Sequence, residues 1–228
     1  MNERRLLLFD IDGTLVTTGG AGERALKDAM EERFQVMEDF EGISLAGATD
    51  GIIARHLLAK HDLPSTPENI ATLLDCYLHH LVQRLPQHVG RVLPGITDLL
   101  LALKPREDVV LALLTGNVSR GAEIKLTHHG VWHFFEFGAF ADDHHDRNEL
   151  GKFAQARAEE RHGHQFPPES IYVIGDTPRD IACGKAIGAR TVAVATGTYS
   201  RDDLLAHAPD LLFDDLTKTD DVLAALLA

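Results

Sequence analysis

The feature of this chain that most restricts its fold is a set of short apolar runs that do not alternate with polar residues. Each run is rich in Val, Ile and Leu and is too short to form a core helix. Such runs are typical of strands that are covered on both faces, as in a parallel sheet. The clearest runs are residues 6–9, 109–114, 171–174 and 191–195, with a weaker run at 136–140 and a possible edge strand at 211–213.

Helical patterns occupy the intervals between these runs. Residues 96–104 follow Pro94 and stop at Pro105, and residues 118–129 end at Gly130, a residue suited to a left-handed helix cap. Residues 182–187 stop in the same way at Gly188. The repeated order of strand and helix predicts an α/β fold with a doubly wound parallel sheet.

The first and second predicted strands are separated by residues 10–108, which is far more than a crossover connection needs. Within this interval, residues 68–85 place apolar side chains at a nearly unbroken helical spacing, and residues 21–34 and 51–61 are also helical by pattern. We therefore predict an inserted all-helical domain at residues 17–88. The α/β core would then comprise residues 1–16 and 89–228.

Composition narrows the range of functions. The chain has 228 residues, 44% of them apolar, and a formal net charge of −13, which disfavours binding to nucleic acid and to anionic membranes. Cys76 and Cys183 both lie in helical patterns, so we expect buried thiols and a reducing compartment rather than a disulfide. The first apolar run is too short for a signal peptide, and no run approaches a membrane span, so we expect a cytoplasmic protein.

Two carboxylates stand at the end of the first apolar run. In an extended strand the side chains of Asp10 and Asp12 point the same way, and Gly13 then lets the backbone turn. Two like charges this close raise each other's pKa unless a cation offsets them. The pair therefore indicates a divalent metal, a proton-transfer role, or both.

Polar residues also follow two later strands. Thr115, Gly116 and Asn117 come after the run 109–114, and Asp176 and Asp180 come after the run 171–174. In an open parallel sheet ligands bind beyond the carboxyl ends of the strands, so we expect these groups to lie near the first pair. Hard oxygen donors suit Mg²⁺. The candidate metal ligands are Asp10, Asp12, Asp176 and Asp180.

These motifs, in their order along the chain, resemble those of the haloacid dehalogenase-like hydrolase superfamily. The matching segments are Asp-Ile-Asp-Gly-Thr at 10–14, the strand that ends in Thr115, a basic residue downstream, and Gly-Asp-Thr-Pro-Arg-Asp at 175–180. The chain looks most like the phosphoglycolate phosphatase and β-phosphoglucomutase branch, which has a Rossmann-like core and a helical cap inserted after the first motif. The resemblance extends over the whole chain.

The resemblance implies a role for each matching residue. Asp10 would be the nucleophile that forms an aspartyl-phosphate, and Asp12 would be the general acid and then the base. Mg²⁺ would be bound by Asp10, the backbone carbonyl of Asp12 and Asp176, with Asp180 as an outer partner. Thr115 would bind the transferring phosphoryl group, assisted by the amides of Gly116 and Asn117.

The third motif departs from the family pattern, which usually has a Lys at this position. Here the segment reads Asp-Arg-Asn-Glu-Leu-Gly-Lys at 146–152. We favour Arg147 as the catalytic and substrate-binding basic residue, because a guanidinium can pair with phosphate and carboxylate together. Lys152, which falls inside the following helix, is the alternative.

The resulting hypothesis is a Mg²⁺-dependent phosphatase that acts on a small phosphorylated metabolite, with phosphoglycolate as a plausible substrate. A phosphomutase of the β-phosphoglucomutase type is the main alternative, and a non-catalytic binding module is a further one. A dehalogenase is disfavoured, because that branch uses neither the metal nor the carboxylate corresponding to Asp12. The loop at 42–50 would hang over the site, with Ser44 and Thr49 as candidate substrate contacts.

Overall fold

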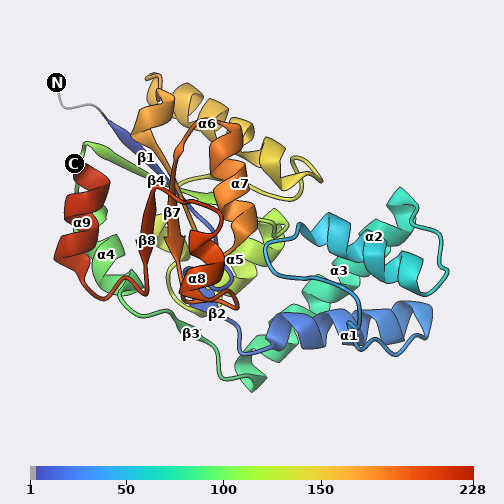
Figure 1. Cartoon of the computed structure of the whole chain (residues 1–228). Helices are drawn as coiled ribbons and strands as arrows, with labels where there is room; N and C mark the ends of the chain where they lie inside the picture. The colour runs from blue at the N-terminus through green and yellow to red at the C-terminus, as the bar shows by residue number, and fades with distance from the viewer. Residues whose placement is uncertain (1–3) are drawn as a thin grey trace.

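The computed structural model describes residues 4–228 and has two parts, an α/β core and a smaller helical lobe (Figure 1). The core is built on a sheet of six strands, all paired in parallel. This confirms the predicted fold class. The strands are β1 (Arg5–Phe9), β4 (Val109–Leu114), β5 (Gly138–Ala139), β6 (Ile171–Gly175), β7 (Arg190–Val194) and β8 (Leu211–Phe213).

The strand order places the start of the chain at the centre of the sheet. The order is β5-β4-β1-β6-β7-β8, so the chain first builds outward on one side of β1 and then on the other. Between β1 and β6 the winding direction reverses. Ligands bind in the crevice that this reversal opens at the carboxyl ends of the strands.

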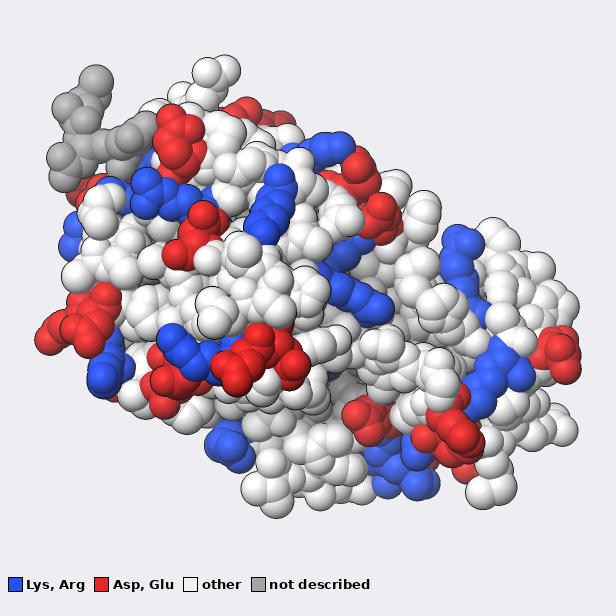
Figure 2. Space-filling view, viewed as in Figure 1, with Lys and Arg blue, Asp and Glu red and all other residues white. Residues whose placement is uncertain are grey.

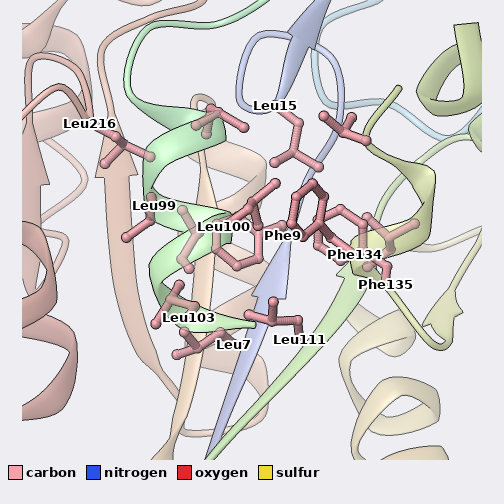
Figure 3. Close-up of a cluster of buried hydrophobic side chains, with 14 of the residues drawn as sticks. Leu7, Phe9, Leu15, Leu99, Leu100, Leu103, Leu111, Phe134, Phe135 and Leu216 are labelled. Atoms are coloured by element: carbon pink, nitrogen blue, oxygen red, sulfur yellow. The ribbon is translucent and has the colours of Figure 1, made fainter. Parts of the chain in front are cut away.

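Helices cover both faces of the sheet, and β1 shows why its sequence is apolar throughout. Leu6 and Leu8 face α6 and α7, whereas Leu7 and Phe9 face α4 on the opposite side (Figure 3). Alternate side chains of a strand point to opposite faces, so a strand covered on both sides needs no polar residue. The core helices are α4 (Ile96–Leu103), α5 (Ser119–His128), α6 (Arg147–His162), α7 (Pro178–Ala186), α8 (Arg201–Leu205) and α9 (Thr219–Leu227).

The second lobe, which we call the cap, consists of α1 (Ala21–Phe34), α2 (Asp50–Lys60), α3 (Pro67–Arg84) and the loops between them. It has an apolar cluster of its own, in which Leu26, Met30 and Leu57 pack with Leu73 and Leu81. Figure 1 shows the cap to one side of the sheet, joined to the core by two neighbouring segments. Charged side chains of both signs are mixed over the face of the two lobes in Figure 2.

The two segments that join the lobes pair with each other. Strand β2 (Val16–Thr17) runs antiparallel to β3 (Arg91–Val92), which brings the start and the end of the inserted segment together. The sequence did not predict this pair, because two-residue strands carry no readable alternation. The pairing places the cap beside the carboxyl end of β1.

The weaker predicted strand at 136–140 is shorter than expected. The strand spans only Gly138–Ala139, and the carbonyl of Phe137 accepts one further hydrogen bond from the amide of Leu113 at 3.1 Å. Phe135, just before this segment, packs edge to face against Phe9 with ring centroids 5.9 Å apart. Both cysteines are buried and free, as expected. Within residues 4–228, no helix combines the length and apolar character that crossing a membrane requires.

Helix α4 offers a matched test of the core. Leu100 is fully buried against the sheet, whereas the side chain of its neighbour Leu101 is 58% exposed. We expect Leu100→Ala to lower the free energy of unfolding by about 2–5 kcal/mol, because it removes apolar contacts and leaves a cavity. Leu101→Ala should change it by less than about 0.5 kcal/mol. Urea unfolding of both variants measures the difference, and equal losses would contradict this packing.

Candidate active site

Asp10 lies directly beyond the central strand, in a buried position. Its amide donates to the carbonyl of Ile174 at 2.9 Å, which extends the pairing of β1 with β6 by one residue. The Asp10 residue is only 4% exposed. Asp12, two residues further on, has a side chain that is 42% exposed. The turn that follows needs a left-handed backbone at Gly13, where φ is +83°.

Asp176 reaches the same point from the end of β6. The Thr14 hydroxyl donates to Asp176 Oδ1 at 3.0 Å. A Cβ at Gly13 would lie 2.3 Å from Asp176 Oδ2, and a Cβ at Gly197 would lie 1.7 Å from it. The carboxylate is therefore enclosed by two backbone segments that can approach so closely only because both residues are glycine.

Arg147 enters the site from the first turn of α6. Its Nη2 lies 2.9 Å from Asp10 Oδ1, and the same nitrogen forms an ion pair with Asp180. Its Nη1 donates to the carbonyl of Gly47, in the cap loop, at 3.2 Å. The Lys152 side chain is 59% exposed and pairs with Glu149 instead. Of the two basic candidates, the structure places only Arg147 beside the carboxylates.

Asp180 has hydrogen-bond or ion-pair partners for both of its carboxylate oxygens. Thr177 donates to Oδ2 from its amide at 3.0 Å and from its hydroxyl at 2.7 Å, which forms a capping box at the start of α7. The other oxygen pairs with Arg147. Asp180 thus positions the helix and the arginine. Because both of its oxygens are engaged, it fits the role of an outer partner of the metal site better than that of a direct ligand.

The loop after β4 is held by its own side chains. Thr115 is fully buried, and its hydroxyl accepts from the side-chain amide of Asn117 at 2.8 Å and from its backbone amide at 3.3 Å. Gly116 lies against the cap loop, because a Cβ there would be 2.2 Å from the carbonyl oxygen of Ala48. Gly116 and Asn117 line the cavity described below, whereas Thr115 does not.

Sequence reasoning missed Lys125, which lies on α5. Its Nζ is 2.6 Å from Asp12 Oδ2 and 2.6 Å from Asn117 Oδ1. A signal was present in the sequence, because Lys125 follows Gly121 and Ala122, which share the buried face of α5, at spacings of four and three residues. A charged side chain on an apolar helix face needs a buried partner.

A cavity of about 450 Å³ lies between the core and the cap. Asp10, Asp12 and Asp176 line its core side. The cap side is formed by α1, α2, α3 and the loop that precedes α2, with Leu26, Leu45, Ala46, Asp50, Ile53 and Tyr77 among the lining residues.

The loop at 42–50 lies over the site as expected, but the two residues suggested as substrate contacts do not line the cavity. Ser44 is exposed. The Thr49 side chain accepts from the amide of Ile52 at 3.4 Å and donates to the carbonyl of His145 at 2.7 Å, so it caps α2. The aspartates could be placed from the sequence because each directly follows a buried strand, whereas the hydroxyls of Ser44 and Thr49 lie in a loop whose path the sequence does not specify.

Burial governs the electrostatics of the acidic group. Loss of water raises the pKa of Asp10 to about 6, although the charge of Arg147 opposes this rise. Burial raises the pKa of Asp176 to about 8, and the charges of Asp180 and Asp10 add to the effect. Burial disfavours the charge of Lys125, but Asp12 and its other neighbours outweigh burial and raise its pKa.

The donor set fits a divalent cation. Oxygens of Asp10, Asp176 and Asp180 lie within 4.8 Å of one another. A cation would relieve the like-charge repulsion and the desolvation that hold the pKa of Asp176 above its ordinary value. Asp10 and Asp176 are the direct candidates, because the side chain of Asp12 faces Lys125 and Asn117 and the oxygens of Asp180 are engaged.

The fold is an open parallel sheet with a helical cap, and its site lies where the winding direction reverses. The site holds the buried carboxylate of Asp10 with Arg147 beside it, an arrangement typical of α/β enzymes that use aspartate side chains in catalysis. The chain belongs to the haloacid dehalogenase-like hydrolase family, whose model matches residues 7–194. This confirms the resemblance inferred from the motifs.

Three similar proteins align with this chain over nearly its full length. A probable phosphatase, IndB, of Dickeya dadantii is 27% identical, with 97% of this chain and 94% of the relative covered. A phosphoglycolate phosphatase of Vibrio cholerae is also 27% identical, with 95% of each chain covered. The structure of CbbY from Rhodobacter sphaeroides in complex with phosphate has the same fold, with a TM-score of 0.76, 22% identity, and 94% and 96% of the two chains covered.

Asp50, on the cap side of the cavity, allows a test of the site's electrostatics. It accepts from the amide of Val118 at 2.8 Å, and burial raises its pKa from 3.8 to about 6. A carboxyl with a raised pKa binds its proton more tightly in the folded state than in the unfolded state. Its contribution to the free energy of unfolding is therefore present below its ordinary pKa and is lost as pH rises through about 6.

We expect the free energy of unfolding to fall less between about pH 4 and about pH 7 in Asp50→Asn than in the wild type, because Asn cannot ionise. Urea unfolding at several pH values measures the difference between the two curves. Asp75→Asn is the control, because the Asp75 side chain is 75% exposed. Parallel curves for wild type and Asp50→Asn would contradict the burial of a charge at this position.

Proposed function

We propose that this protein is a Mg²⁺-dependent phosphatase that hydrolyses a small phosphate monoester through an aspartyl-phosphate on Asp10. The observation that carries the proposal is the environment of Asp10. The carboxylate is 4% exposed and faces a cavity, and a guanidinium holds one of its oxygens. The family to which the chain belongs and the phosphatases among its relatives support this chemistry.

In the first step Asp10 acts as the nucleophile. Arg147 holds Oδ1 at 2.9 Å, and within residues 4–228 no hydrogen bond reaches Oδ2. Oδ2 attacks phosphorus, so that a bond from Oδ2 to phosphorus forms and the bond from phosphorus to the alcohol oxygen breaks. The proton that the leaving alcohol needs comes from Asp12, which lines the same cavity.

In the second step water replaces the alcohol. Asp12, now a carboxylate, accepts a proton from a water molecule, and the water oxygen attacks phosphorus. The bond from phosphorus to Asp10 breaks, which releases inorganic phosphate and regenerates the Asp10 carboxylate. Asp12 therefore gives up one proton and takes one back in each cycle.

The charge on the phosphoryl group requires positive partners. Arg147 supplies a guanidinium, and Gly116 can offer its backbone amide from the cavity wall, whereas the amides of Asn117 already donate to Thr115 and Asp12. The Thr115 hydroxyl does not line the cavity; it accepts from both amides of Asn117 and so would hold the loop that presents the Gly116 amide to the phosphoryl group. Positioning and charge neutralisation of this kind supply most of the catalysis in phosphoryl transfer.

Asp10 and Asp176 would hold Mg²⁺, together with the backbone carbonyl of Asp12, and Asp180 would act as an outer partner. Oxygen donors and few nitrogens are what Mg²⁺ requires. When bound, the cation supplies charge neutralisation for the phosphoryl oxygens and for the two buried carboxylates.

The cavity sets the size of the substrate. At about 450 Å³, and closed on one side by the cap, it accepts a small metabolite and excludes a macromolecule. Phosphoglycolate fits this limit, and phosphoglycolate phosphatases occur among the relatives. The cap would also exclude bulk water during the first step.

A phosphate-release screen over many small monoesters with Mg²⁺ tests the proposed function. We expect turnover of at least one compound in the wild type and a loss of about 10³-fold or more in Asp10→Asn, because an amide oxygen is a poor nucleophile. Removal of the metal with a chelator should abolish turnover, and added Mg²⁺ should restore it.

Wild type and Asp10→Asn that are equally inactive on every compound would overturn the proposal. Isomerisation of glucose 1-phosphate without net phosphate release would favour the phosphomutase instead. Circular dichroism of Asp10→Asn should match the wild type, which shows that the fold survives the change.

The choice between the two basic residues has its own test. We expect Arg147→Ala to lower kcat/KM by about 100-fold or more, because it removes a charge that holds Asp10 and faces the phosphoryl group. Lys152→Ala, five residues further along α6, should retain about wild-type activity, since its exposed ion pair contributes little. A loss of activity confined to Lys152→Ala would overturn the assignment of Arg147.

A further inference from the structure

Lys125 is a buried charge for which the proposed chemistry gives no role. It lies in the second half of α5 and is only 5% exposed. Burying an ammonium group is costly unless partners replace the lost water. Here the partners are two residues of the site, because Nζ is 2.6 Å from Asp12 Oδ2 and 2.6 Å from Asn117 Oδ1.

The hydrogen bonds to Asp12 all reach the same oxygen. Lys125 donates to Asp12 Oδ2, and Asn117 Nδ2 donates to the same atom at 2.8 Å. In the part of the chain that the structure describes, no hydrogen bond reaches Asp12 Oδ1. Two donors on one oxygen fix the rotation of the carboxyl group about its Cβ–Cγ bond. The other oxygen is left free for proton transfer in the cavity that Asp12 lines.

The same ammonium group borders the cap. Tyr77, on α3, is 2% exposed, and a Cβ at Gly22 would lie 3.9 Å from the Tyr77 hydroxyl and 4.0 Å from Lys125 Nζ. Both side chains therefore border Gly22 of α1. Lys125 therefore lies where the cap contacts the core.

We propose that Lys125 is a positioning residue that orients Asp12 for proton transfer to the leaving alcohol. The inference rests on the proposed function, in which Asp12 is the general acid. Lys125 also lines the cavity, but both of its hydrogen bonds end on Asp12 and Asn117, so it acts through these side chains. Its loss should therefore impair the step that depends on Asp12 more than the steps that do not.

The leaving group of the substrate separates these steps. An alkyl alcohol must receive a proton as it departs, whereas 2,4-dinitrophenolate is stable as an anion and needs none. We expect Lys125→Met to lower kcat/KM by about 100-fold for an alkyl phosphate, which is a typical contribution of general acid catalysis. For 2,4-dinitrophenyl phosphate the loss should be less than about 10-fold. The parameter kcat/KM is suitable because it reports only the steps up to alcohol departure.

Lys152→Met is the matched control, because it makes the same substitution at an exposed lysine. It should leave both rates at about the wild-type value. Lys125→Arg retains a charged donor and should recover part of the alkyl phosphate rate. Lys125→Gln serves if Lys125→Met fails to fold, since it retains a donor without the charge. Equal losses on the two substrates would show a merely structural role and would overturn the proposal.

A second measurement does not require activity. The melting temperatures of Asp12→Asn, Lys125→Met and the double variant form a cycle that measures how strongly the two side chains are coupled. We expect the double variant to be destabilised by less than the sum of the single changes, because Asp12→Asn alone leaves a buried ammonium group without its carboxylate. Additive shifts would overturn the proposal. A wild type inactive on every monoester would refute the proposed function, whereas the cycle would still decide whether Lys125 holds Asp12.

Discussion

The arrangement of this site depends on the concentration of negative charge at the carboxyl end of the central sheet. Asp10 and Asp176 come from adjacent strands, and burial raises the pKa of both carboxyls because it disfavours their charged forms. Arg147 contacts Asp10 and Asp180 together and so offsets part of this cost. A bound divalent cation would offset more of the cost of burying these carboxylates. Binding would therefore stabilise the loops that carry Asp10 and Asp176.

The cations come from helices that pack on opposite faces of the sheet. Arg147 begins α6, on the face that Leu6 and Leu8 cover, and Lys125 lies on α5, on the face of Leu7 and Phe9. Each cation pairs with one of the two aspartates that follow β1. This separation gives Asp10 and Asp12 different surroundings although they are two residues apart, and different surroundings are what two different roles require.

The cap contributes more than a lid. Its loop accepts a hydrogen bond from Arg147 at the carbonyl of Gly47, and the Asp50 amide donates to the carbonyl of Gly116 at 2.7 Å. Tyr77 and Asp50 border the cavity opposite the carboxylates. Opening the cap would therefore remove contacts from the phosphate loop and from the arginine at once, so that closure and assembly of the site are physically connected.

The fold and the family could be read from the sequence because their signals are local. The unalternating run at residues 6–9 requires cover on both faces, and Asp10 and Asp12 follow it directly, so the position of both carboxylates was predictable. The helical spacing of residues 68–85 likewise indicated the cap helix α3. The tertiary structure alone decided which cation meets which carboxylate. Arg147 and Lys152 are separated by little more than one helical turn, and the direction of α6 buries the first and exposes the second. Lys125 is distant from Asp12 in sequence and meets it only because α5 packs beneath the cap, so no local pattern could show that contact.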